Sequence, residues 1–577
     1  MKRWDAASLP LAVLLTLSSA AVVFSILAIQ AFPVSPAQQP PQGGFPVDSI
    51  LDKLSGDALL TIQAMRGVTT FSIGGKTVTV PPAQQLDVGL LSSQPVGVSP
   101  YSENEPSIAV RPNNPSFVVA VMHYYAEPFG FPNCAAFRST NNGLTWTGPV
   151  PLPLPTPPSG YVVWCSDPVV RYSPDGSKVY AAYMAIFCDP NNCGNTMFAH
   201  IVVSRSTNNG QSWSPPVIAI AGGPNRFPDK PWLDVHRFYP GGTTNNRVYV
   251  TATVFTSTGC QIEFTSSTNG ATSFATPQVV STSPGCMVQG SRPIGGPAVS
   301  SSVGYVLVCW YNSEDDGWLV GKFDIRCRTS SDYGSNWGAE VAAVDNMYSE
   351  LTYWLGPDCA YHRWWGGMFP SMMIGPDGVA HIVFTADLTR PHPFDDLSGC
   401  PEWDEDGDGS PDDIDGDDIA GEPGADDEAG DIFYVRSPGP PYNTWSRPHM
   451  VSDDYSGFAQ GYPTVNVRVV NGVPIVFVAW MDHRVSSWTG YPNILYSIFA
   501  SWTYPGRWGW WEPNVQIDSV ESMSDYIFIG DYIDSSTANT GTPFVHVIWT
   551  DRSDKKSIPG DIFDFEDDVW TTRVSLP

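Results

Sequence analysis

Short apolar segments recur along the chain in a regular order. Each unit opens with a short apolar segment, continues with a more hydrophobic one that often ends in aromatic residues, and adds two further segments around a turn. Segments of this length, separated by Gly- and Pro-rich turns, are typical of β-strands. Seven opening segments are recognised, beginning at Pro106, Asp167, Pro231, Gly296, Phe369, Tyr462 and Tyr526.

These seven units predict an all-β fold, a seven-bladed β-propeller with one four-stranded sheet per unit. Neighbouring units begin roughly 60 to 90 residues apart, which leaves room for four strands and their connections. Each blade must bury its faces against its neighbours, so the ring has to close. In the last unit, Asp568–Ser575 is a plausible closing strand.

An octapeptide with a fixed pattern of polar and small residues marks several units. STNNGLTW at Ser139–Trp146 returns at Ser206–Trp213 and Ser330–Trp337, with a looser copy at Ser266–Phe274. Its Asn or Asp can hydrogen-bond the backbone ahead of it, and its glycine tolerates a positive φ. The terminal Trp or Phe can enter a core between sheets. We therefore expect a structural turn on the outer rim, remote from any active site.

On these octapeptides the chain resembles the BNR or Asp-box repeat family, whose best-known members are β-propellers of the sialidase superfamily. The resemblance covers residues 101–577 and implies the propeller fold, with sialidase-like glycoside hydrolysis as one candidate activity. Family sialidases have six blades, and the last unit here lacks a recognisable octapeptide, so a six-bladed ring is the alternative count. Sialidases also carry an Arg-Ile-Pro motif ahead of the first octapeptide and three arginines for a sugar carboxylate. No such motif precedes Ser139, and the nearest similarity is Arg292-Pro293-Ile294.

The N-terminal part predicts export. Lys2 and Arg3 precede a stretch of about 22 largely apolar residues, long enough to span a bilayer. Cleaved signal and retained anchor both stay open, and in either case the positive residues orient the rest of the chain outward, secreted or held at the cell surface. The expected division is a signal peptide or transmembrane anchor at 1–31, a Pro/Gln-rich linker at 32–46, an accessory region at 47–100 with a helix and a hairpin, and the propeller at 101–577.

The negative charge is concentrated in one segment. Residues 395–431 hold 17 of the 58 acidic residues and no Lys or Arg, in a chain of net charge −29. A charge of this sign disfavours nucleic acid as a partner. Within the segment, DEDGDGSPDDID has the ligand spacing of a calcium loop around Gly409, the alternative being a solubilising acidic loop. The expected ligands of a structural calcium ion are Asp404, Asp406, Asp408, Ser410, Asp412 and Asp415.

The ten cysteines agree with an oxidising compartment, since they are even in number and none forms a CxxC pair. Their spacing suggests that neighbours in sequence pair within a blade or loop. The expected pairs are Cys134/Cys165, Cys188/Cys193, Cys260/Cys286, Cys309/Cys327 and Cys359/Cys400.

Candidate ligand-binding residues lie just before the opening segments, because propellers bind ligands around the channel where their innermost strands begin. They are Glu105, Asp167, Asp229, Lys230, Arg292, Tyr462 and Asp531. Carboxylates combined with one Lys and one Arg suit a polyhydroxylated ligand, and the alternative is charge pairing that closes the channel. For an enzyme, the catalytic candidates are Arg292, Asp167, Asp229 and Asp531.

The leading functional hypothesis is an exported recognition module for carbohydrate or an extracellular protein, because the resemblance is specific for fold and weak for activity. The alternatives are a sialidase-like glycoside hydrolase and a structural cell-surface component. A membrane contact is expected through the N-terminal segment if that segment is retained.

Overall fold

A computed structural model provides the structure of the protein. It describes residues 103–125, 132–193, 196–237, 246–282, 288–313, 322–348, 369–386, 430–454, 460–485, 495–505, 509–519, 529–553 and 567–576, together with the short pieces 45–46, 70–73, 76–79, 93–97, 353–355, 361–363 and 521–523. The elements in these ranges are all β-strands.

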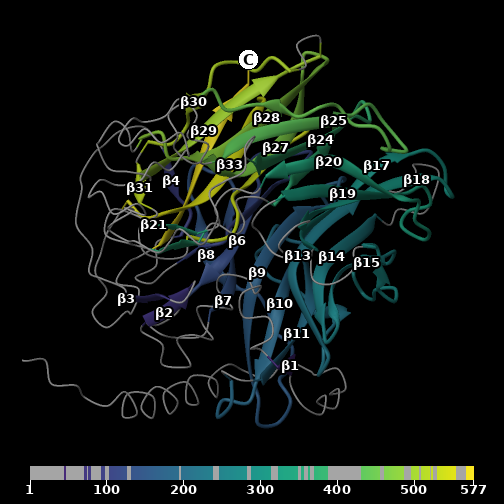
Figure 1. Cartoon of the computed structure of the whole chain (residues 1–577), viewed down its shortest axis with the longest axis vertical. Coiled ribbons are helices and arrows are strands. Elements are labelled where there is room, and N and C mark those ends of the chain that lie inside the picture. The colour runs from purple at the N-terminus through teal and green to yellow at the C-terminus, as the bar shows by residue number, and fades with distance from the viewer. Residues whose placement is uncertain are drawn as a thin grey trace, which may run out of the picture.

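Seven antiparallel sheets follow one another around the molecule and form a seven-bladed β-propeller, which confirms the predicted fold (Figure 1). Blade 1 contains β5 (Ser107–Val110), β6 (Val118–Tyr124), β7 (Asn133–Ser139) and β8 (Thr147–Pro151). Blade 2 contains β9 (Val162–Tyr172), β10 (Val179–Cys188), β11 (Thr196–Ser206) and β12 (Val217–Ala221). Blade 3 contains β13 (Arg226–His236), β14 (Arg247–Thr256), β15 (Gly259–Ser267) and β16 (Gln278–Val279).

The second half of the ring has the same construction. Blade 4 contains β17 (Val288–Ala298), β18 (Gly304–Ser313), β19 (Lys322–Ser330) and β20 (Glu340–Tyr348). Blade 5 contains β23 (Ser371–Ile374), β24 (Ala380–Ala386), β25 (Asp431–Ser437) and β26 (His449–Met450). Blade 6 contains β27 (Gln460–Val470), β28 (Val473–Asp482), β29 (Leu495–Thr503) and β30 (Val515–Gln516), with β31 (Ser522–Met523) also paired to β29. Blade 7 contains β32 (Asp534–Thr537), β33 (Phe544–Asp551), β34 (Asp568–Ser575) and β4 (Gln94–Pro95).

The ring is closed by strands from both ends of the propeller sequence. The C-terminal strand β34 is the third strand of blade 7, whereas the outermost strand is β4, which pairs with it at Trp570 and Thr571. The sequence therefore predicted β34 (Asp568–Ser575) as a closing strand but did not predict its partner β4. A two-residue strand carries too little hydrophobic pattern to be recognised from sequence.

Five further short strands precede the propeller or lie between its blades. The hairpin expected before residue 81 is present as β2 (Thr70–Ile73) and β3 (Lys76–Thr79). Strand β1 (Phe45–Pro46) pairs with β11 of blade 2, and β21 (Tyr353–Leu355) pairs with β22 (Tyr361–Arg363).

The inner strands touch one another all the way round the central channel, in the order β5, β9, β13, β17, β23, β27, β32 and again β5. The second strands lie between neighbouring sheets and are buried on both faces, as β10 is along its whole length. This explains why they read as continuous apolar runs instead of alternating ones. Large aromatic residues fill the space between sheets, among them Trp310, Trp480 and Trp549.

The observed starts of the inner strands differ from the expected ones, most of all in blades 4 and 7. Strand β17 already starts at Val288 and contains Arg292 and Pro293, whereas the apolar pattern placed its beginning at Gly296. The pairing of β17 with β18 shifts register twice. Pro293 and the adjacent glycines are unusual in a strand, so the hydrophobic pattern does not predict one there. In blade 7 the inner strand β32 begins at Asp534, so the described residues 529–533, which were expected within the strand, precede it.

The octapeptides form the expected turns. In the first, the Ser139 hydroxyl accepts the Gly143 N–H at 2.9 Å and Asn141 Oδ1 accepts the Thr145 N–H at 3.0 Å. The same two bonds recur in the other three copies, which start at Ser206, Ser267 and Ser330. Each turn also lies against the preceding blade, since a Cβ on Gly210 would be 3.2 Å from the Val119 methyl carbons. The turns thus connect neighbouring sheets.

Three of the expected disulfides are confirmed, Cys134–Cys165, Cys188–Cys193 and Cys309–Cys327. Cys260 is also disulfide-bonded. Several predictions fall outside the described residues. They concern Cys286, Cys359 and Cys400, the calcium loop, the N-terminal apolar segment and the helix expected within 47–100. Among the described residues, no helix is long and apolar enough to cross a membrane.

Candidate functional site

A strained backbone position recurs where the inner strands begin. A residue that precedes a proline within or just before the inner strand has a positive φ, between 50° and 55°, in four blades: Glu105, Asp167, Lys230 and Tyr462. In blades 2, 3 and 6 the ladder to the second strand shifts register at this point. Non-glycine residues in this region are unfavourable by about 1 to 3 kcal/mol each, and bulges of this kind re-aim side chains. Three of the four residues carry charge and meet at one end of the channel.

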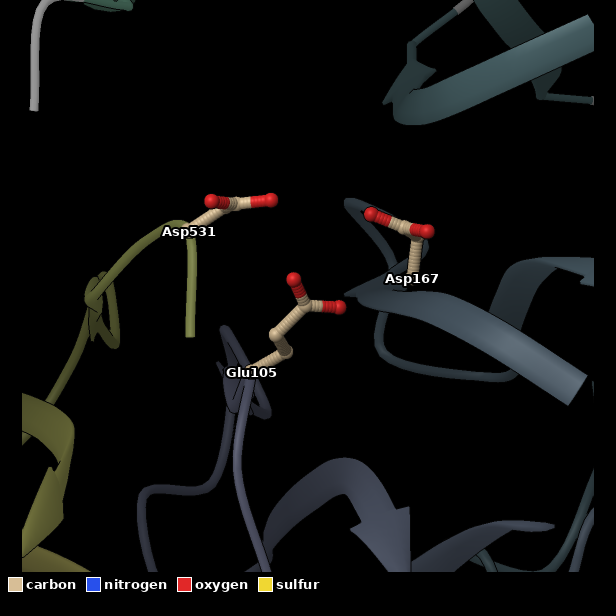
Figure 2. A group of neighbouring side chains, drawn as sticks. All are labelled: Glu105, Asp167 and Asp531. Carbon is tan, nitrogen blue, oxygen red and sulfur yellow. The ribbon is translucent and has the colours of Figure 1, made fainter. Parts of the chain in front are cut away.

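The Lys230 ammonium lies among three carboxylates from three other blades. Its Nζ pairs with Asp531 and lies 3.2 Å from Asp167 Oδ1 and 3.7 Å from Glu105 Oε1. The three carboxylates converge (Figure 2), with one oxygen of each within 4.8 Å of the others. All four side chains are buried, and Lys230 is only 4% exposed. We call these four residues the lysine cluster. Because buried charges are tolerated only when paired, the cluster holds blades 1, 2, 3 and 7 together.

Three carboxylates at this spacing form a set that could bind a metal ion. Here the Lys230 ammonium lies among them, so the chain supplies its own cation. The surrounding carboxylates outweigh the effect of burial and raise the pKa of Lys230 above its ordinary value. Lys230 is therefore charged throughout the physiological pH range.

Asp167 is fixed from several sides. Its Oδ1 accepts the Tyr532 hydroxyl at 2.8 Å and its Oδ2 accepts the Ser166 hydroxyl at 2.7 Å. Its backbone N–H donates to His123 Nε2 at 2.9 Å. Since Nε2 accepts, the ring proton of neutral His123 lies on Nδ1, 2.8 Å from Asn104 Oδ1. The carboxylate cannot turn without breaking this network.

Two neighbouring carboxyl groups have opposite tendencies to ionise. Burial raises the pKa of Asp229 to about 8, and the nearby Asp167 and Asp531 carboxylates act in the same direction. Burial also disfavours ionisation of Asp167, but the Lys230 ammonium and several hydrogen bonds outweigh it and hold the pKa of Asp167 below its usual value. At neutral pH Asp229 thus keeps a proton while Asp167 is a carboxylate, a combination that general acid–base chemistry uses.

A cavity of about 120 Å³ lies farther along the channel. Inner strands of six blades line it, and its principal polar and aromatic side chains are Arg171, Trp232, Arg292, Ser371, Asn466 and Asp534. A closed ring of inner strands therefore encloses a small polar space on the propeller axis, a usual place for a ligand.

Arg292 is the most unusual residue of this cavity. Its side chain is only 7% exposed, and its guanidinium carbon lies 3.0 Å from the centroid of the Trp232 ring. Among the described residues, none accepts a hydrogen bond from it and no carboxylate lies within ion-pair distance. Burial, together with the positive charge of Arg171, lowers the pKa of Arg292 to about 9. A buried cation without an anion is unfavourable, so this position is prepared for an anionic group.

The carboxylate nearest to this cation is already used. Asp534 accepts two hydrogen bonds from Arg171, Nη1 to Oδ2 at 2.7 Å and Nη2 to Oδ1 at 3.2 Å. It also accepts the Ser107 hydroxyl at 2.7 Å and the Ile108 N–H at 3.1 Å. Asp534 thus pairs directly with Arg171, whereas its carboxylate acts on Arg292 only from beyond ion-pair distance.

The residues selected from sequence divide into three groups. Those of blades 1, 2, 3 and 7 come together in or beside the lysine cluster: Glu105, Asp167, Asp229, Lys230 and Asp531. Arg292 lies apart from them, in the cavity. Tyr462 belongs to the hydrophobic cluster of blades 6 and 7 that also contains Phe477 and Ile529.

Sequence reasoning missed Arg171, Trp232, Tyr532 and Asp534. The candidate residues were those just before each opening segment, whereas Arg171 lies inside the apolar segment DPVVRY. A charged residue within an apolar inner strand was a usable signal. Tyr532 and Asp534 were hidden because the inner strand of blade 7 was placed too early.

Fold and site together define a seven-bladed β-propeller with a polar cavity on its axis. No protein-family model matches the chain, and no characterised protein matches it in sequence. Among solved structures it is similar to the NanB sialidase of Streptococcus pneumoniae, with 10% identity, a TM-score of 0.37, and 84% of this chain and 70% of that chain covered. It is also similar to the phage phi92 endosialidase (8%, 0.41, 84% and 69%) and to an α-L-arabinanase of Penicillium chrysogenum (11%, 0.37, 84% and 98%). These likenesses assign no residue of this chain a role.

Proposed function

We propose that this protein is a carbohydrate-recognition propeller and that it binds an acidic sugar residue in the channel cavity. The observation that carries the proposal is Arg292, a buried guanidinium with no acceptor among the described residues. A sugar carboxylate would supply the missing anion and could accept two parallel N–H bonds. Asn466 and Ser371 offer further polar atoms for hydroxyl groups.

The size of the cavity limits what it can hold. Pockets for drug-sized ligands usually measure about 300 to 1,000 Å³, whereas this one measures about 120 Å³. The ligand group inside it is therefore a single small unit, and the remainder of a larger glycan stays outside.

Glycoside hydrolysis of the sialidase type is the second candidate. The opposite protonation of Asp229 and Asp167 favours it, because one group could donate a proton while the other stays ionised. Both side chains are fully buried, and Asp167 is tied to Lys230 and Tyr532. A recognition role therefore ranks first.

Binding is tested with the full chain on an array of acidic and neutral glycans, followed by titration with D-glucuronate and with N-acetylneuraminate. The proposal expects acidic sugars to bind and Arg292→Ala to weaken binding at least tenfold. Arg328→Ala, in the same blade but on its exposed third strand, is the matched control and should bind normally. If no acidic sugar binds, or if Arg292→Ala binds as well as the native chain, the proposal is wrong.

A fluorogenic sialoside assay on the same preparations separates recognition from hydrolysis. Binding without turnover supports the recognition role. Turnover that disappears in Asp229→Asn, while binding remains, would instead establish the hydrolase.

We also propose that the protein acts outside the cytoplasm, secreted or anchored, and that the Asp404–Asp415 loop binds a structural calcium ion. The three disulfides support an oxidising compartment. Calcium binding is tested by isothermal titration of the full chain. A signal that persists unchanged when Asp404 and Asp408 are both replaced by Ala would contradict the calcium loop.

A further inference from the structure

We propose that the channel is closed at the end where the inner strands begin, and that the ligand reaches Arg292 only from the opposite face, where these strands end. The inference deepens the proposed function, since it says how the ligand arrives and which way it points. Access to Arg292 can also be measured without any ligand.

The first end is blocked by buried charge. The carboxylates of the lysine cluster, together with Asp229, have no exposed surface. Neighbouring blades also approach closely there, because a Cβ on Gly530 of blade 7 would lie 2.9 Å from the Glu105 backbone nitrogen. Glycine at this position, with a φ of +92°, is what allows blade 7 to come so near to blade 1. At this end the charged side chains are therefore buried and blades 1 and 7 are closely packed.

From the lysine cluster toward the ends of the inner strands, exposure increases in several blades. In β9, Asp167 is fully buried, whereas the side chain of Arg171, four residues later, is 23% exposed. In β32, Asp534 is buried and Ser536 and Thr537 are half-buried. The half-buried residues Ser536, Thr537 and Met373 all line the cavity, which therefore opens where the inner strands end.

The charges along the channel favour the same direction. From the open end an anion first meets Arg171, which is partly exposed and paired with Asp534, and the half-buried Asp234, which accepts the Gly295 N–H. Arg292, which is buried, follows. Beyond Arg292 lies the lysine cluster, in which three carboxylates surround one ammonium. An anion approaching through that cluster would be repelled before it reached the arginines. The ligand thus enters with its anionic group first, and the rest of it projects from the open face.

Chemical modification of Arg292 tests the route. Butane-2,3-dione reacts with guanidinium groups, and peptide mapping measures its rate at Arg292 relative to Arg226, whose side chain is 40% exposed. In the full chain, Met373→Cys at the open end is capped with a bulky polyethylene glycol maleimide. The matched variant is Glu521→Cys, capped in the same way, next to β31 on the opposite face. Uncapped samples of each variant and their thermal unfolding control for folding.

The proposal expects Arg292 to react in both uncapped variants, to react at least tenfold more slowly when Met373→Cys is capped, and to be unaffected by the cap on Glu521→Cys. The proposal is wrong if the cap on Glu521→Cys protects Arg292, alone or as strongly as the cap on Met373→Cys. It is also wrong if the cap on Met373→Cys gives no protection, or if Arg292 never reacts. If no acidic sugar binds the native chain but the modification of Arg292 follows the expected pattern, the proposed function is wrong and the proposed access route is supported.

Discussion

Arg171 of blade 2 and Asp534 of blade 7 form a two-point ion pair across the central channel, with N–O distances of 2.7 and 3.2 Å. The pair joins blades that are not neighbours and lies beside Arg292, which has no such partner. One arginine of the cavity is thus neutralised for stability, while the other stays available. The cavity is lined by Arg171 and Arg292 and by the carboxylates of Asp234 and Asp534. Because Asp534 is hydrogen-bonded to Arg171, the Arg292 guanidinium can still attract an anion.

Replacing Arg292 should separate binding from stability. Arg292→Met removes a buried cation that has no anion but keeps an apolar chain against Trp232. We expect acidic-sugar binding to fall at least tenfold while the free energy of unfolding stays equal or rises by about 1 kcal/mol, since a costly buried charge is gone. Isothermal titration and denaturant unfolding measure the two effects. A large loss of stability would show that Arg292 is a structural residue.

Breaking the ion pair of Arg171 should have the opposite effect. Asp534→Asn leaves the Arg171 guanidinium without its carboxylate, and we expect a loss of about 2 kcal/mol, at the lower end for buried pairs because Arg171 is partly exposed. Asp453→Asn is the control, since Asp453 also pairs with an arginine, Arg484, but its side chain is 47% exposed. A loss below about 1 kcal/mol is expected there. Equal losses in denaturant unfolding would contradict the importance of burial.

Removing the ammonium of the lysine cluster should destabilise the closed ring. Lys230→Met leaves Glu105, Asp167 and Asp531 buried together, and we expect a loss of about 3 to 5 kcal/mol at pH 7. The loss should shrink at pH 5, because protonation relieves the repulsion. Thermal unfolding at both pH values measures this, with the half-buried Lys178→Met as control. A loss independent of pH would show that packing, not charge, is what Lys230 contributes.

The octapeptide turns allow a matched pair of glycine substitutions. Gly210 has a φ of +78° and faces Val119, so Gly210→Ala should cost about 1 to 2 kcal/mol. In the third copy Ala271 occupies the equivalent position with a φ of +57°. Ala271→Gly should therefore be neutral or stabilise by up to about 1 kcal/mol. Chemical denaturation measures both, and a clear loss in Ala271→Gly would show that its buried methyl group matters more than backbone strain.

Stability should fall as the pH rises from about 6.5 to 8. Burial raises the pKa values of Asp518 and Asp229 to about 8. Between pH 4 and 8 these two groups therefore hold protons in the folded state that the unfolded state has already released. The free energy of unfolding that they contribute decreases as the pH rises and is lost near pH 8. Burial lowers the pKa values of His381 and His546 to about 3, so their effect is confined to pH values below 6.5, where stability falls with falling pH.

The range above pH 6.5 therefore isolates the two carboxyl groups. Asp518→Asn should flatten the decrease in the melting temperature between pH 6.5 and 8, whatever its effect on the absolute value. Glu512→Gln, at a half-buried position, is the control. An unchanged slope in Asp518→Asn would show that this carboxyl group is ionised in the folded protein.

Repetition made the fold accessible from sequence. The octapeptide places a serine hydroxyl and an Asn or Asp side-chain oxygen on equivalent backbone N–H groups in every copy, so its local chemistry predicts the turn without tertiary information. The second strands are apolar throughout because they are buried on both faces. Where the pattern was irregular, in β17 with Pro293 and in the short β32 and β4, strand boundaries were misplaced or missed.

The candidate site shows where sequence information ends. The seven blades, their turns, three disulfides and the polar residues near the start of the inner strands could be predicted from sequence, because each depends on neighbours along the chain. The tertiary structure was needed to show that Lys230 meets carboxylates from three other blades, that Asp534 pairs with Arg171, and that Arg292 lies against aromatic rings without an ion-pair partner among the described residues. Charge pairing in a closed ring depends on distances between residues hundreds of positions apart, and burial determines how strongly each charge needs a partner.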